Sequence, residues 1–347
     1  MLVESPPEQR AAPAPGPRNR RALRAFGLLL SVVVLALVAV ASIAIGAKEL
    51  SLEQVWHGLF HDTGTYGDVV VADRLSRTLL GVLAGAALGL AGAVLQALTR
   101  NPLADPGLLG INAGASAAVV TAITFFGVTS LSGYVWFAFC GAAAVGALVW
   151  FLGGSRSATP VRLVLAGTAI TAALFGYLQA VMILDDAALG KMRFWTVGSL
   201  SSADDSTIVQ VLPFLLAGTV LALGLARPLN AMAMGDDTAK ALGANLNRTR
   251  ALSMLAATVL CGAATAACGP IVFVGLMVPH AVRSFTGPDL RWILPYAAVL
   301  SPVLLLGADV LGRIVARPAE LQVGIVTAVI GGPLFIFLVR RRRTAQL

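Results

Sequence analysis

The sequence predicts an all-α integral membrane protein with ten transmembrane helices, on the evidence of its composition, its apolar blocks and its charge distribution. Of the 347 residues, 57% are hydrophobic and only 12% are charged, and the mean hydropathy is +0.84. Soluble domains are ordinarily about 45–50% apolar and about 25% charged. The apolar residues form blocks of about 20, the helix length that crosses a hydrocarbon core of ~30 Å. These features exclude a soluble enzyme.

The chain begins with a basic segment ahead of the first apolar block. Residues 1–24 are rich in Pro, Ala and Arg and contain no apolar run, which predicts a disordered cytoplasmic tail before a membrane domain over 25–347. The first span is predicted over 27–47. A signal peptide is the alternative for this block, but about 20 apolar residues exceed the usual 7 to 15 of a signal sequence.

Nine further apolar blocks predict the remaining spans, with glycines at four-residue spacing (Gly81, Gly85 and Gly89) that favour close helix packing. The stretch 249–286 also fits one long helix followed by a re-entrant segment, because prolines interrupt it. The predicted spans after the first are 77–98, 111–130, 133–152, 161–183, 207–226, 249–268, 271–286, 292–312 and 323–339.

The distribution of basic residues predicts the orientation of these spans. With the amino terminus inside, the predicted cytoplasmic segments carry 18 of the 25 Lys and Arg residues and the outer segments carry seven. Cytoplasmic loops of membrane proteins retain such an excess of Lys and Arg. We therefore expect both termini to be cytoplasmic.

The sequence lacks the residue patterns of an enzyme or of a self-powered carrier. It contains no G-x-x-x-x-G-K-[ST] loop that would wrap nucleotide phosphates. We found no mid-span chain of ionisable residues like those of proton- or sodium-coupled carriers. No serine, cysteine or carboxylate pair suggests a catalytic arrangement. We predict no catalytic residue, and any ATP must be handled by another chain.

Cysteines and histidines give no evidence of a metal site or a disulfide framework. Cys140, Cys261 and Cys268 lie in apolar runs without paired spacing, which is typical of small core residues. His57 and His61 have the i, i+4 spacing that suits a metal on one helix face. We nevertheless predict no metal site.

Four of the arginines on the predicted outer side flank the second and ninth spans, against the general charge bias. Arg74 and Arg77 flank the start of the second span, and Arg313 and Arg317 follow the ninth. Exposed outer arginines favour an acidic partner. The alternative is that they extend to lipid headgroups.

The longest predicted inner loop, 227–250, contains the segment GDDTAKALG at 235–243. Asp236 and Asp237 suit the positive N-terminal end of a short helix, and Gly243 suits its close. A short structured helix in this loop favours docking to a cytoplasmic protein. The alternative is that the loop only caps the bundle.

Six separated motifs resemble the FecCD-type permeases, the membrane subunits of bacterial ABC importers for iron-siderophores, haem and cobalamin. The resemblance covers nearly the whole chain after residue 27. The motifs are RLSRT at 74–78, NPLADPGLLG at 101–110, the 227–250 loop, GPI at 269–271 with FVGL at 273–276, VPH at 278–280, and PAEL at 318–321 with GIVT at 324–327.

This resemblance implies the type II ABC importer permease architecture and its partners. These are a second permease subunit, the same or a relative, two cytoplasmic ATPases that use ATP and Mg²⁺, and an external binding protein, in the bacterial inner membrane. The chain itself is expected to bind no cofactor and no nucleic acid.

The favoured cargo is a ferric siderophore, since iron chelates are the commonest cargo in the family, with haem or cobalamin as alternatives. Other classes left open are a secondary carrier or channel and a structural scaffold. The basic tail contacts anionic lipid or has no role.

The resemblance also implies roles for individual residues. Acidic knobs of the binding protein are expected to dock on the outer arginines, of which Arg317 is included by position only, and reversing Arg74 and Arg77 together is expected to weaken docking without loss of folding. The docking residues are Arg74, Arg77, Arg313 and Arg317. The ATPase-coupling residues are Gly235, Asp236, Ala239, Leu242 and Gly243.

The inner gate is expected to include Asn101 and Leu103. Where the family has hydroxyl residues before the fifth span, this sequence has Pro160 and Val161, with Thr159 just before them. Either the alignment slips by one position or the gate closes here through apolar contact.

Overall fold

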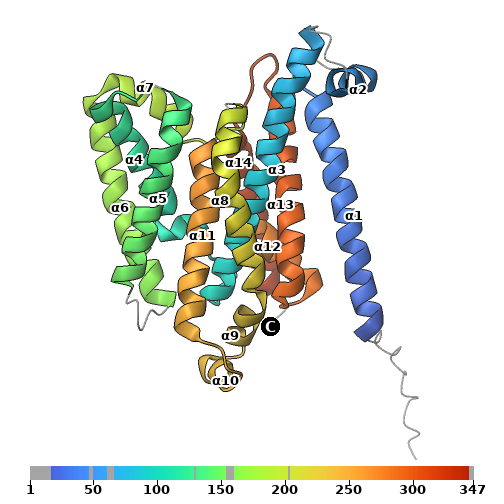
Figure 1. Ribbon diagram of the computed structural model, residues 1–347, viewed down its shortest axis with the longest axis vertical. Helices are drawn as coiled ribbons and strands as arrows, with labels where there is room; N and C mark the ends of the chain where they lie inside the picture. The colour runs from blue at the N-terminus through green and yellow to red at the C-terminus, as the bar shows by residue number, and fades with distance from the viewer. Residues whose placement is uncertain are drawn as a thin grey trace, which may run out of the picture.

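A computed structural model describes residues 17–46, 50–60, 66–128, 130–153, 160–201 and 204–343, and these residues form helices and no strand (Figure 1). Each of the ten predicted spans coincides with one helix. These helices are α1 (Pro17–Ala44), α3 (Tyr66–Leu98), α4 (Ile111–Phe126), α5 (Leu131–Leu152), α6 (Pro160–Leu184), α8 (Asp205–Gly224), α11 (Leu246–Cys268), α12 (Val274–Thr286), α13 (Leu290–Val315) and α14 (Val323–Arg343).

The ten helices that match the predicted spans differ in length within the described residues. Seven helices are long and apolar enough to cross a membrane, whereas α4 and the apolar part of α14 are shorter. Helix α12 has only 13 residues and begins at Val274 rather than 271. Helix α1 begins at Pro17, so the predicted disordered tail is wrong for 17–24; residues 1–16 lie outside the described part of the chain.

Five short elements lie between the spans, and the sequence predicted only one of them. Helix α10 matches the predicted helix after Gly235. Helix α2 is amphipathic and buries Val55 against Val71 of α3, and α7 begins where the side chain of Asp185 accepts hydrogen bonds from two backbone amides. The short elements are α2 (Leu52–Phe60), the 3₁₀ turn η1 (Pro106–Leu109), α7 (Asp186–Trp195), α9 (Ala226–Ala233) and α10 (Asp236–Ala241).

Helices α3 and α11 form the centre of the bundle, while α1 and the group α4 to α7 lie on opposite sides of it (Figure 1). Glycines allow the central contacts. A Cβ on Gly92 would collide with the carbonyl oxygen of Gly275, and a Cβ on Gly85 would lie 2.7 Å from the Cα of Pro302. The backbones of α12 and α13 therefore approach α3 directly, and the contact at Gly85 confirms a packing role for that member of the predicted glycine stripe.

The bundle has two distinct ends. Helix α2 and the start of α3 mark one, here called the α2 end, and α9 and α10 mark the opposite α10 end (Figure 1). The hydroxyl of Tyr296 donates to the carbonyl of Arg24 at 2.6 Å, and Asn230 of α9 donates to Asp289 at 2.7 Å. The start of α1, the 227–250 connection and the start of α13 thus lie at one end, toward which α14 also runs.

Candidate docking, coupling and gate sites

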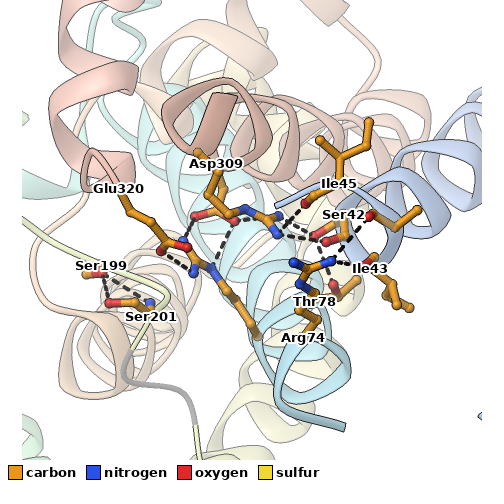
Figure 2. A network of polar contacts seen from close by, with 12 residues as sticks. Ser42, Ile43, Ile45, Arg74, Thr78, Ser199, Ser201, Asp309 and Glu320 are labelled. Atoms are coloured by element: carbon orange, nitrogen blue, oxygen red, sulfur yellow. Dashed lines mark hydrogen bonds and ion pairs between the residues drawn. The ribbon is translucent and has the colours of Figure 1, made fainter. Parts of the chain in front are cut away.

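The arginine cluster at the α2 end consists of Arg74, Arg77 and Arg313 with Asp309 and Glu320. Figure 2 labels Arg74, Asp309 and Glu320 among them. Asp309 receives two arginines: Arg77 Nη2 lies 2.7 Å from Oδ1, and Arg313 Nη2 lies 2.9 Å from Oδ2. Arg77 Nη1 also lies 2.6 Å from Oε2 of Glu320. Three positive and two negative side chains leave the cluster one positive charge in excess.

Two of these arginines also bind the end of α1. Arg74 Nη1 donates to the carbonyl of Ile43 at 2.8 Å, and Arg313 Nη1 donates to the carbonyls of Ser42 and Ile45, both at 2.8 Å (Figure 2). The last carbonyls of a helix lack intrahelical partners and carry partial negative charge. The arginines satisfy these carbonyls and fix α1 to α3 and α13.

The expectation that these arginines are exposed is wrong. The exposed fraction is 8% for Arg74, 9% for Arg77 and 2% for Arg313. They are buried because Asp309, inside the apolar helix α13, supplies a countercharge and the end of α1 supplies acceptors. Reversing Arg74 and Arg77 would place new carboxylates beside these acceptors, so we no longer expect folding to survive it. Arg317 is exposed, and the docking role of all four arginines stays a prediction.

The coupling segment at the α10 end has the predicted local structure. Gly235 precedes α10 with φ +107° and Gly243 follows it with φ +81°, in the left-handed region that favours glycine. Leu242 is 63% exposed and presents an apolar side chain. Ala239 is fully buried and belongs to the main hydrophobic core, so its predicted place on a contact face is wrong.

Asp236 joins the coupling segment to two transmembrane helices. Arg250 Nη2 of α11 lies 2.6 Å from Oδ2, and Arg100 Nη2 at the end of α3 binds Oδ1. Burial acts to raise the pKa of Asp236, but the hydrogen bond from Arg100 and the charges of Arg250 and Arg100 outweigh it and hold the pKa below its ordinary value. Asp236 is therefore ionised at neutral pH.

A second link joins α9 to α13. Asn230 Nδ2 donates to Asp289 Oδ1 at 2.7 Å, and the backbone amide of Leu290 donates to Asn230 Oδ1 at 2.9 Å. Arg291 also binds Asp289, and this hydrogen bond is the main cause that lowers the Asp289 pKa to about 2, against the opposing effect of burial. The 227–250 connection is thus attached to α3, α11 and α13.

Two of the predicted gate residues lie in an exposed turn, and the other two begin helix α6. Asn101 Oδ1 accepts a hydrogen bond from the backbone amide of Leu103 at 2.9 Å, and both residues are exposed in the turn after α3. Helix α6 begins at Pro160, and Val161 is 67% exposed. Thr159 lies outside the described residues. The gate assignment therefore stays a prediction.

An open cavity of about 430 Å³ lies between η1 and α6. Its lining residues are Gly107, Thr168, Thr171, Ala172 and Phe175. Their side chains are small, hydroxylic or aromatic and carry no charge. Among the described residues, no group of three His, Cys, Asp or Glu side chains is placed to hold a metal ion, and His61 lies outside those residues.

Comparison with known proteins identifies the family to which this architecture belongs. The family model described as the FecCD transport family matches residues 34–341. The chain belongs to the FecCD transport family. Membership identifies it as a transport permease subunit, a multi-pass membrane protein that works with ATPase and substrate-binding partners, and not as an enzyme.

Individual FecCD relatives match over nearly the full chain. The ferric enterobactin transport system permease protein FepD of Escherichia coli is 47% identical over 93% of this chain and 96% of its own. The Fe(3+)-citrate import system permease protein YfmD of Bacillus subtilis is 38% identical over 95% and 98%. A metal-chelate type ABC transporter solved in an inward-facing conformation matches with a TM-score of 0.80 at 29% identity, covering 92% and 99%.

Sequence reasoning missed several residues that organise these sites. Asp309 precedes Arg313 by four residues, a spacing at which side chains meet on one helix face, so the pair was recognisable. Arg100 and Asp236 are 136 residues apart and Asn230 and Asp289 are 59 apart. No local pattern joins such residues, and only the fold brings them together.

Proposed function

We propose that this FecCD permease imports a ferric siderophore by alternating access, driven by partner ATPases. The observation that carries the proposal is the coupling segment: exposed Leu242 follows α10, Asp236 of α10 binds Arg100 after α3 and Arg250 of α11, and the neighbouring α9 is linked to α13 through Asn230. A movement of α10 would therefore reach the bundle. The cargo follows from the relatives, since FepD is named for ferric enterobactin and others for ferric citrate and hydroxamate.

The proposed assembly contains two permease subunits, identical or related, two cytoplasmic ATPases and an external binding protein in the bacterial inner membrane. The α10 end faces the cytoplasm with both termini, which agrees with the excess of Lys and Arg in the segments that the sequence places inside. ATP and Mg²⁺ are used by the ATPases. This chain binds no cofactor and no nucleic acid.

In the proposed cycle, the loaded binding protein docks at the α2 end, where the arginine cluster carries an excess positive charge. When the ATPases bind ATP and close, they move α10, which Gly235 and Gly243 flank and which Asp236 connects to the bundle. The helices then expose the pathway to alternate sides. The turn bearing Asn101 and Leu103 and the start of α6 at Pro160 and Val161 close its inner end. The uncharged lining between η1 and α6 suits passage of a bulky chelate without tight binding.

Reconstitution tests the proposal. The complete importer in proteoliposomes, with ferric enterobactin loaded on the binding protein and ATP supplied to the ATPases, should accumulate the chelate, and a complex lacking the ATPases should not. Uptake that persists without the ATPases would indicate a secondary carrier and overturn the proposal. Accumulation of haem in preference would favour the second candidate, since the hemin permease HmuU of Yersinia pestis is 38% identical.

A further inference from the structure

The turn after α3 has an unusual residue at its key position. Arg100 adopts φ +50°, a left-handed conformation that side chains other than glycine and asparagine seldom adopt. Its amide donates to Ala97 and the amide of Asn101 donates to Gln96, at 3.3 and 3.2 Å. This pair of hydrogen bonds is the helix-ending motif that ordinarily has glycine where Arg100 stands.

The Arg100 side chain gives a reason for this choice. Its Nη2 donates to the carbonyl of Met232 at the end of α9, at 2.6 Å, and binds Asp236 at the start of α10. One guanidinium thus spans the junction between the two short helices of the coupling connection. A glycine would suit the backbone better and would lose both contacts.

Arg100 is also the residue directly before the predicted gate turn. Asn101 follows it in the chain, and the Asn101 side chain accepts the backbone amide of Leu103. A displacement of α10 that pulls on the guanidinium therefore acts on the backbone from which this turn begins. Arg250, the other arginine on Asp236, lies within α11 and has no such position.

We propose that Arg100 is a positioning residue that transmits movement of α10 to the turn containing Asn101 and Leu103, and so couples ATP use to the inner gate. This inference rests on the proposed function of the permease. It separates two roles of the Asp236 site: Arg100 connects the coupling segment to the gate turn, and Arg250 holds the segment to the bundle.

The decisive variant is Arg100→Gly in the complete reconstituted importer. Glycine suits the left-handed turn, so the end of α3 is preserved while the link to Asp236 and Met232 is removed. We expect the amount of ferric enterobactin taken up per ATP hydrolysed to fall roughly tenfold, the scale of a coupling energy between sites. If Arg100 only ends the helix, this ratio stays at the wild-type value, which would overturn the inference.

Two further variants control for charge and for the shared carboxylate. Arg100→Lys keeps the charge but not the fork of donors, and it should recover part of the lost coupling. Arg250→Gln removes the other arginine from Asp236, and it should change uptake per ATP by no more than about twofold. Equal losses in Arg100→Gly and Arg250→Gln would assign the effect to α10 as a whole and would also overturn the inference.

A second measurement follows the gate turn directly, even where uptake is too weak to quantify. Leu103→Cys, in a background with the exposed Cys140 replaced by Ala, should change its rate of labelling by a charged maleimide when the ATPases bind a non-hydrolysable ATP analogue. Adding Arg100→Gly should abolish this change. A change that persists would refute the link, whereas absence of ATP-driven uptake by the wild-type complex would instead refute the proposed function.

Discussion

Two aspartates at opposite ends of the bundle have the same kind of partners but differ greatly in the exposure of their side chains. Asp309 at the α2 end and Asp236 at the α10 end each bind two arginines, which in both cases come from two different segments of the chain. The side chain of Asp309 has no exposed surface, whereas that of Asp236 is 37% exposed. The same ionic arrangement therefore occurs in two settings, one fully buried and one partly exposed.

The difference lies in the cost of separating the charges. When the partner of a buried ion is removed, no water solvates the charge that remains, and the protein typically loses ~3–5 kcal/mol of stability. Exposed pairs are worth about 0.2–1 kcal/mol because water solvates each partner when the pair opens. Only the α10 end can therefore exchange its ionic contacts during a transport cycle without large expense of free energy.

The largest predicted effect is that of Asp309→Asn. The variant leaves Arg77 and Arg313 buried with one carboxylate, that of Glu320, between them, and we expect the free energy of unfolding to fall by ~3–5 kcal/mol. Unfolding of the purified protein in detergent measures this loss. Glu320→Gln is the control, since its side chain is 36% exposed, and it should cost about 1 kcal/mol or less. Equal losses in the two variants would contradict the assigned role of burial.

The same substitution at the α10 end, Asp236→Asn, should cost about 1 kcal/mol of stability or less, and this difference should shrink with added salt. Its main effect should be lower uptake per ATP in the reconstituted importer, because α10 loses its contact with Arg100. Asp237→Asn is the matched control on the same helix, where the side chain is fully exposed. A large loss of folded protein in Asp236→Asn would remove the contrast between the two ends.

The sequence predicted the helices well because each span must satisfy its own backbone in lipid, which makes the apolar block a local signal. It also predicted α10 from Gly235, Asp236 and Gly243, since caps and charges act within one turn. Helices α2 and α7 were missed because they are short and lie outside the apolar blocks. Local sequence patterns therefore explain why the spans and α10 were predicted and why α2 and α7 were missed.

The candidate site was harder to predict because its exposure depends on contacts between distant segments. Arg74 and Arg77 look exposed in the sequence, being charged and at the end of a span. The structure buries them against the end of α1 and against Asp309, which lies 232 residues from Arg77. Charge alone does not reveal whether an arginine faces a partner protein or its own chain.

The third predicted effect concerns docking at the α2 end. Glu320→Gln removes one of the two carboxylates of the arginine cluster and raises its excess positive charge. Affinity for an acidic binding protein should then rise by about twofold to fivefold at low salt, the scale of one exposed charge pair, and the gain should vanish at high salt. Binding to immobilised permease measures it, and Arg317→Gln should act in the opposite direction. Affinity unchanged in both variants would argue against docking at this surface.

The smallest predicted effect is the pH dependence that Asp289 gives to the α10 end. Its pKa is about 2 in the folded protein, against an ordinary value of 3.8, so its ionised form stabilises the fold above about pH 4. This contribution is lost as the pH falls toward 2. The unfolding midpoint of wild type should exceed that of Asp289→Asn near neutral pH, and the gap should narrow below about pH 4. It should close toward pH 2, because a protonated Asp289 and the Asn side chain of the variant can both accept the backbone amide of Arg291 at the start of α13. A gap that stays constant over this range would mean that the charge of Asp289 contributes nothing to attaching α9 to the bundle.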